Sequence, residues 1–103
     1  MDDAILDKLR AEHGDVWLLD LGSDQVAFRC PNRAEYKRFL ARVSDDRKAL
    51  PDAQEELARA VVVLPDRPAF SALLDKRPGI ASKVVADALK VAGAEEAENA
   101  KKL

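Results

Sequence analysis

The sequence contains one cysteine, so no disulfide can form within the chain, which is typical of proteins from a reducing compartment. No apolar run approaches the roughly 20 residues that a membrane-spanning helix needs. The first ten residues, MDDAILDKLR, are acidic and amphipathic, whereas a secretory signal begins with a basic segment followed by an apolar one. We therefore expect a cytoplasmic protein.

Other scarcities exclude most kinds of catalytic site. The four glycines are scattered singly, so there is no glycine-rich phosphate loop. Cys30 and His13 are the single members of their types, too few for a zinc site built from cysteine and histidine. A serine or cysteine nucleophile needs a histidine base, and His13 lies where a helix is expected to end. We expect no enzyme activity, no catalytic residue, no cofactor and no metal site.

Length and charge indicate one soluble domain. The chain has 103 residues, of which 48% are apolar and 35% charged, and its formal net charge is −2. This charge argues against a dedicated nucleic-acid binder, which normally has a basic excess. We expect a single α+β domain over residues 1–93. Residues 94–103 are charged and have no apolar stripe, so we expect a frayed or disordered tail there.

Residues 16–21 and 25–30 are short alternating segments that predict a β-hairpin. If Leu21 faces Val26, residues 22–25 form a four-residue loop. One face is then apolar and consists of Trp17, Leu19, Leu21, Val26, Phe28 and Cys30. The other face is mixed and consists of Val16, Leu18, Asp20, Ala27 and Arg29. Because two strands alone are marginal in water, the hairpin should pack on helices, with at least one strand edge open.

Helix signals surround the hairpin and predict a small, mostly helical α+β domain with one N-terminal β-hairpin packed on helices. The clearest start is Asn32, an N-cap residue with Glu35 at the capping-box position. The helix that follows should cover the apolar face of the hairpin with its stripe of Tyr36, Phe39, Leu40 and Val43. Helices are expected at about residues 3–13, 33–43, 51–64, 67–76 and 80–92, with a flexible connection at 44–50. The β-branched run 61–64 also fits a short strand, although the preceding alanines favour helix.

Four basic residues lie opposite that apolar stripe: Arg33, Lys37, Arg38 and Arg42. On a soluble domain such residues usually form a solvated face. They also fit a patch for an acidic partner. A small DNA-associated regulator that uses these four residues is therefore an alternative function.

Four short motifs, taken in their order along the chain, resemble the small tail assembly chaperones of tailed bacteriophages and their prophage remnants. The motifs are His13–Val16, Phe28–Arg33 leading to Tyr36, Val62–Arg67 and Arg77–Ile80. The likeness spans about residues 11–93, and Asn32 replaces an aspartate that is common in these proteins. Each motif is turn or capping chemistry, so the order of the motifs carries the resemblance.

The resemblance implies a protein without catalytic residues that acts in the cytoplasm of the host bacterium. Such proteins are thought to keep the tape measure protein soluble and to recruit tail tube subunits, and they are absent from the finished particle. We therefore expect the tape measure and tail tube proteins as partners, with a homo-oligomer also open and no membrane. The expected partner-binding residues are Val16, Leu18, Arg29, Arg33, Lys37 and Arg38. A structural tail or connector component that stays in the particle is the main alternative.

Overall fold

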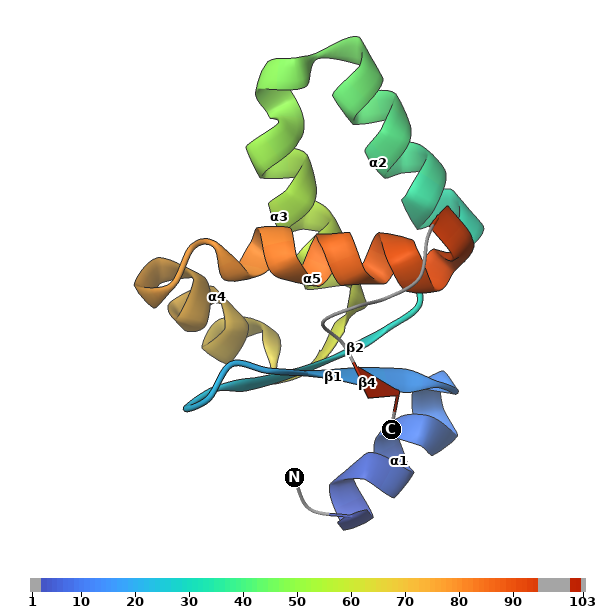
Figure 1. The fold of residues 1–103 in the computed structure, drawn as a ribbon, viewed down its shortest axis with the longest axis vertical. Helices are drawn as coiled ribbons and strands as arrows, with labels where there is room; N and C mark the ends of the chain where they lie inside the picture. The colour runs from blue at the N-terminus through green and yellow to red at the C-terminus, as the bar shows by residue number, and fades with distance from the viewer. Residues whose placement is uncertain (1–2, 95–100, 103) are drawn as a thin grey trace.

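The computed structural model describes residues 3–94 and 101–102 and has the expected α+β fold, mostly helical with an N-terminal hairpin (Figure 1). A small sheet lies between α1 on one side and the other helices on the opposite side, and α2 and α3 project away from it. The elements in chain order are α1 Asp3–His13, β1 Val16–Asp20, β2 Gln25–Arg29, α2 Arg33–Asp45, η1 Arg47–Ala49, α3 Leu50–Val61, β3 Val62–Leu64, α4 Arg67–Lys76, α5 Ile80–Leu89, η2 Lys90–Ala94 and β4 Lys101–Lys102.

The hairpin of β1 and β2 forms in a register two residues away from the predicted one. Leu19 faces Val26 and Trp17 faces Phe28, so the predicted pairing of Leu21 with Val26 is wrong. The loop is residues 21–24, closed by a 2.8 Å hydrogen bond from the amide of Leu21 to the carbonyl of Asp24. Because side chains alternate with period two, a shift of two leaves every side chain on its predicted face. The rings of Trp17 and Phe28 accordingly stack, with centroids 6.2 Å apart.

The strand order is β3-β2-β1-β4, so β3 pairs with the outer edge of β2. On the outer edge of β1, β4 pairs only with Trp17 and Leu18, so among the described residues the predicted open edge is covered only in part. Residues 62–64 extend as β3 instead of prolonging the preceding helix, because β-branched residues favour extended backbone and β2 offers unpaired ladder groups. Lys101–Lys102 pair with β1, so this part of the predicted tail is a strand. The rest of the tail prediction falls on residues 95–100 and 103, which lie outside the described residues.

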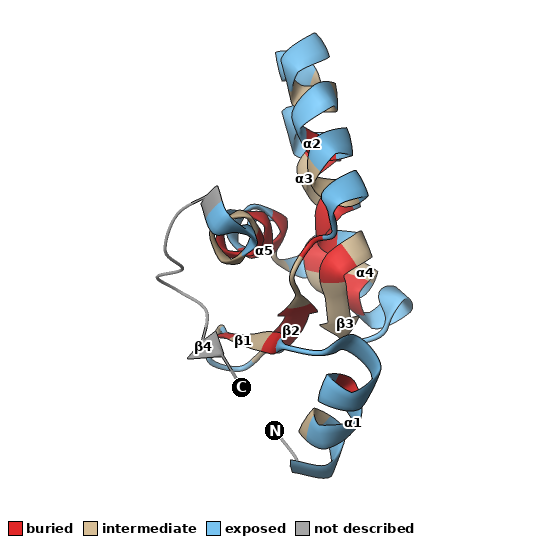
Figure 2. Ribbon diagram, turned by 90° about the vertical axis from the view of Figure 1, so that its right-hand side faces the viewer, coloured by how far each residue is buried: buried red, intermediate tan, exposed pale blue. Residues whose placement is uncertain are grey.

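The main core lies between the aromatic face of the hairpin and α5, which crosses that face and packs on α3 (Figures 1 and 2). The predicted cover by α2 is wrong, because α2 turns away from the sheet and pairs with α3. Of the α2 stripe, Phe39 is buried in the core, whereas Leu40 is 43% exposed. The larger buried side chains of this core are Leu19, Val26, Phe28, Phe39, Leu57, Val61, Phe70, Leu74, Ile80, Val84 and Val85.

The other face of the sheet is covered by α1, and β3 adds side chains to this face. Val16 and Ala27 have no exposed surface and form a second apolar cluster with Leu9, Val63 and Leu64. The prediction that this face is free to bind a partner is therefore wrong. The reason is tertiary, since α1 folds back over this face and β3 extends it at the edge of β2.

Replacing Leu9 with alanine should loosen α1 from the sheet. Leu9 is the one buried residue of α1, so its truncation should lower the free energy of unfolding by about 1–2 kcal/mol. Urea denaturation measures this loss, and hydrogen exchange should show faster exchange confined to α1 and β1. Ile5→Ala is the control, because Ile5 is 42% exposed and should change stability by less than about 0.5 kcal/mol. Equal effects of the two substitutions would contradict the role of Leu9 as the anchor.

Candidate functional site

The most prominent surface feature is the helical hairpin of α2 and α3, residues 33–61, which we call the arm (Figure 1). Figure 2 shows that most of the arm is exposed toward its tip. The tip is a tight helical turn in which the carboxylate of Asp46 accepts a 2.9 Å hydrogen bond from the amide of Lys48, and Pro51 lies in the first turn of α3. Where a flexible connection was predicted at 44–50, the structure has the end of α2, the turn η1 and the start of α3.

The base of the arm is fastened by a capping box and an arginine. Asn32 accepts a 2.8 Å hydrogen bond from the amide of Glu35, and Glu35 accepts one of 2.9 Å from the amide of Asn32, which confirms the predicted cap. Arg29 donates to both carboxylate oxygens of Glu35 at 2.8 Å and to the carbonyl of Ala60 at 2.9 Å. Arg29 therefore joins β2 to both helices of the arm. Its predicted role in partner binding is wrong, because its donors are used inside the fold.

The hydrogen bonds between Arg29 and Glu35 favour the charged form of both side chains. Hydrogen bonds from Arg29 lower the pKa of the Glu35 carboxyl, against the opposing effect of burial. The same contact raises the pKa of Arg29. At neutral pH both side chains of the pair are thus ionised. We call this ion pair, which links β2 to the arm, the strut. Burial raises the pKa of the adjacent Cys30 thiol, so this thiol is protonated at neutral pH and poorly nucleophilic.

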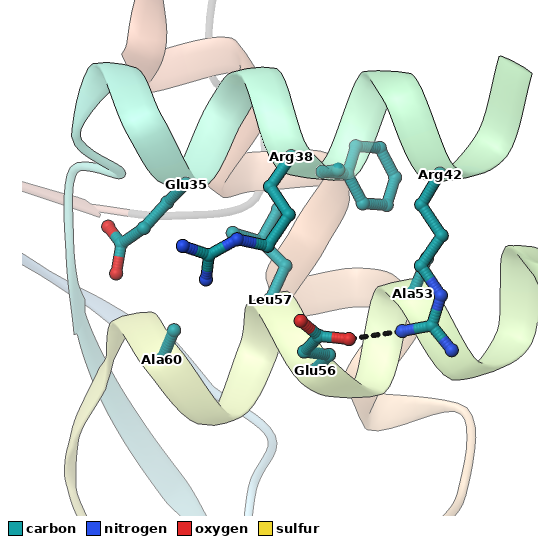
Figure 3. A pocket seen from close by; sticks show the side chains of 8 residues that line it. Glu35, Arg38, Arg42, Ala53, Glu56, Leu57 and Ala60 are labelled. Carbon is teal, nitrogen blue, oxygen red and sulfur yellow. Dashed lines mark hydrogen bonds and ion pairs between the residues drawn. The ribbon is translucent and has the colours of Figure 1, made fainter.

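A narrow groove runs along the seam between the two helices of the arm (Figure 3). Four residues line it from each helix, at i, i+3, i+4 and i+7 in both cases: Glu35, Arg38, Phe39 and Arg42 from α2, and Ala53, Glu56, Leu57 and Ala60 from α3. The floor is apolar, with Phe39, Ala53 and Leu57 buried. The two alanines keep the seam hollow because their side chains do not reach across it.

The size of the groove restricts what it can hold. Its volume is about 20 Å³, room for about one water molecule. Pockets for small-molecule ligands usually measure about 300–1,000 Å³. The groove therefore fits part of a side chain presented by another protein better than a metabolite.

Basic side chains form the rim of the groove. Arg38 reaches from α2 toward α3, and Arg42 pairs with Glu56 across the seam (Figure 3). Arg33, Lys37 and Arg38 are exposed, and within residues 3–94 and 101–102 their side chains make no hydrogen bond or ion pair. These three predicted binding residues therefore share an accessible surface on the arm.

The predicted binding residues do not form one site. Val16 is fully buried and Leu18 is partly buried in the sheet under α1, whereas Arg33, Lys37 and Arg38 lie on the arm beyond the opposite face. Sequence reasoning did not predict that Ala53, Glu56 and Ala60 line a groove. Their i, i+3, i+7 spacing indicates that they share one face of a helix. Only the packing of α3 on α2 shows that this face lines a groove.

One further residue was missed by sequence reasoning. Asp87 on α5 has no exposed surface, and neither of its carboxylate oxygens has a hydrogen-bond partner among the described residues. In the same part of the chain, no three His, Cys, Asp or Glu side chains come together as a metal site. Within the described residues, no helix is both long enough and apolar enough to span a membrane.

Comparison with known proteins gives one match. Residues 9–101 match the sequence model of a family described as a domain of unknown function, DUF6848. The match takes in β1, β2, β3, the arm and α4 and α5, reaches the first residue of β4, and leaves out most of α1. No curated protein and no solved structure matches the chain.

Proposed function

This chain belongs to the DUF6848 family, and we propose that it is a tail assembly chaperone of a tailed bacteriophage or prophage. In this role it binds the tape measure protein in the host cytoplasm and assists assembly of the tail tube through protein–protein contacts. The observation that carries the proposal is the projecting arm, whose apolar groove is too small for a metabolite. The order of the sequence motifs adds the resemblance to tail assembly chaperones.

The arm has the features that a helix-binding surface needs. A partner helix binds a groove through apolar anchors spaced at i, i+3, i+4 and i+7. Besides the groove, the arm exposes Leu40 at 43% and Leu50 at 38%. Contacts of this small size support weak, reversible binding, which suits a protein that must release its client during assembly.

The four motifs of the resemblance lie where a helix begins or ends. Gly14 ends α1 with φ of +78°, and its amide donates a 2.8 Å hydrogen bond to the carbonyl of Arg10. Asn32 caps α2, and Asp66 caps α4 by accepting from the amide of Ala69 at 3.0 Å. The motifs therefore support a shared architecture, and the proposed binding surface lies between the second and third motifs.

Co-expression tests the function. The tape measure protein encoded in the same gene cluster should gain solubility when this chain is present, and mass spectrometry of purified particles should find the tape measure protein without this chain. No gain in solubility would overturn the proposal. Finding the chain in finished particles would favour a structural tail or connector component instead.

Filling the groove should weaken this activity without unfolding the arm. In Ala60→Leu the larger side chain occupies the hollow, whereas the backbone carbonyl that accepts from Arg29 stays in place. We expect about a tenfold loss of affinity for the tape measure protein, measured by titration with the purified complex. Ala41→Leu is the matched control, because Ala41 is exposed on α2 and does not line the groove. If both variants bind like the natural protein, the partner contacts another surface.

A further inference from the structure

Positive charge is concentrated on one side of the arm. The whole chain has a formal net charge of −2, yet residues 33–48 contain six basic and three acidic residues. Of those acidic residues, Glu35 forms an ion pair with Arg29, and Asp46 caps the turn at the tip. The surface of α2 and η1 is therefore basic although the protein is not.

Most of these cations have no ion-pair partner among the residues that the structure describes. Arg42 is paired with Glu56, whereas the other five are exposed and have no ion pair within residues 3–94 and 101–102: Arg33, Lys37, Arg38, Arg47 and Lys48. The opposite helix differs, since Glu55 is paired with Arg59 and Glu56 with Arg42. Grouped like charges of this kind attract a partner of opposite charge and orient it as it approaches.

Arg38 connects this charge to the groove. Figure 3 shows its guanidinium over the seam, and its charge contributes to the lowered pKa of nearby Glu35. Both oxygens of Glu35 are already bound by Arg29, so Arg38 keeps its donors for another carboxylate. A side chain that enters the groove thus meets an apolar floor and an unpaired guanidinium at the rim.

We infer that the arm selects an acidic amphipathic helix, with an apolar anchor for the groove and a carboxylate one turn away that pairs with Arg38. The spacing follows from helix geometry, because residues three or four apart lie on the same face. This inference rests on the proposed function in that it names the chemistry of the segment bound at the same groove.

A helix fits these observations better than a nucleic acid does. Phosphate binding needs basic residues but has no use for the buried floor of Phe39 and Leu57 or for exposed Leu40. Binding of a DNA duplex is therefore compared with binding of the peptides in the test below.

Two synthetic helical peptides with the same leucine stripe test the inference, one with glutamate and one with lysine at the flanking positions. Fluorescence anisotropy with the full chain should give at least about tenfold tighter binding of the glutamate peptide, and this preference should shrink as salt is raised. The double variant Lys37→Glu with Arg38→Glu should reverse the preference. Lys76→Glu with Lys83→Glu is the matched control, because it makes the same charge change at exposed positions away from the arm. Circular dichroism checks that both double variants fold.

Each outcome separates this inference from the proposed function. Equal binding of the two peptides, or tighter binding of a DNA duplex than of the glutamate peptide, overturns the acidic helix. Failure of both peptides to bind also overturns it, while a gain in tape measure solubility would leave the chaperone function standing. Selective binding of the glutamate peptide without any gain in solubility would leave the acidic helix standing and remove the chaperone.

Discussion

Replacing Arg29 with methionine should lower the free energy of unfolding by about 2–4 kcal/mol at neutral pH. Methionine keeps much of the apolar stem but removes the hydrogen bonds that Arg29 donates to Glu35 and to the carbonyl of Ala60. The side chains of Arg29 and Glu35 are only 24% and 14% exposed, so water restores little of the lost interaction. Urea denaturation followed by Trp17 fluorescence measures the loss. We also expect weaker binding at the groove, because the strut sets how the arm meets the sheet.

The pH dependence gives this prediction a second readout. Arg29 holds the pKa of Glu35 below its usual value of 4.5, so the contribution of the pair is complete above that pH and is lost as pH falls through the lower folded pKa. The natural protein should therefore lose stability below about pH 4.5 more steeply than Arg29→Met. Arg59→Met removes an exposed pair with Glu55 and should cost at most about 0.5 kcal/mol. A large effect at Arg59, or the same acid slope in Arg29→Met as in the natural protein, contradicts the strut.

Replacing Asp87 with asparagine should raise the free energy of unfolding by about 2–3 kcal/mol at neutral pH. Asp87 is fully buried in α5, and within the described part of the chain its carboxylate oxygens accept no hydrogen bond. Burying a charge without a partner is costly, and asparagine removes the charge with almost no change in shape. Urea denaturation at pH 7 measures the gain.

Asp75→Asn is the control, since Asp75 is exposed on α4 and its substitution should change stability by less than about 0.5 kcal/mol. A loss of stability in Asp87→Asn would show that the folded protein uses this charge. In that case Asp87 would become a candidate for a functional group in its own right.

The sequence by itself determined where α2 and α4 begin and where glycine ends α1 and the last helical segment. Asn32 with Glu35, and Asp66 before α4, are capping residues that satisfy free amides within one turn of chain. Gly14 and Gly93 adopt positive φ where the sequence predicts that helices end. These features depend on neighbours a few residues away, so the local sequence contains the information that specifies them. The alternation of the hairpin likewise determined which side chains share a face, even though the register was predicted wrongly.

Only the tertiary structure decided how these elements are placed. The loop of the hairpin is also contacted from outside, where Arg77 donates to the carbonyl of Leu21 and to the carboxylate of Asp24, both at 3.3 Å. Residues 62–64 became a strand because β2 was there to pair with them. Because α5 packs over the sheet, α2 pairs with α3 instead and forms the arm. In this arrangement Arg29 can reach the carbonyl of Ala60 on α3. All of these depend on contacts between residues far apart in the chain, whose free energies local propensity does not contain.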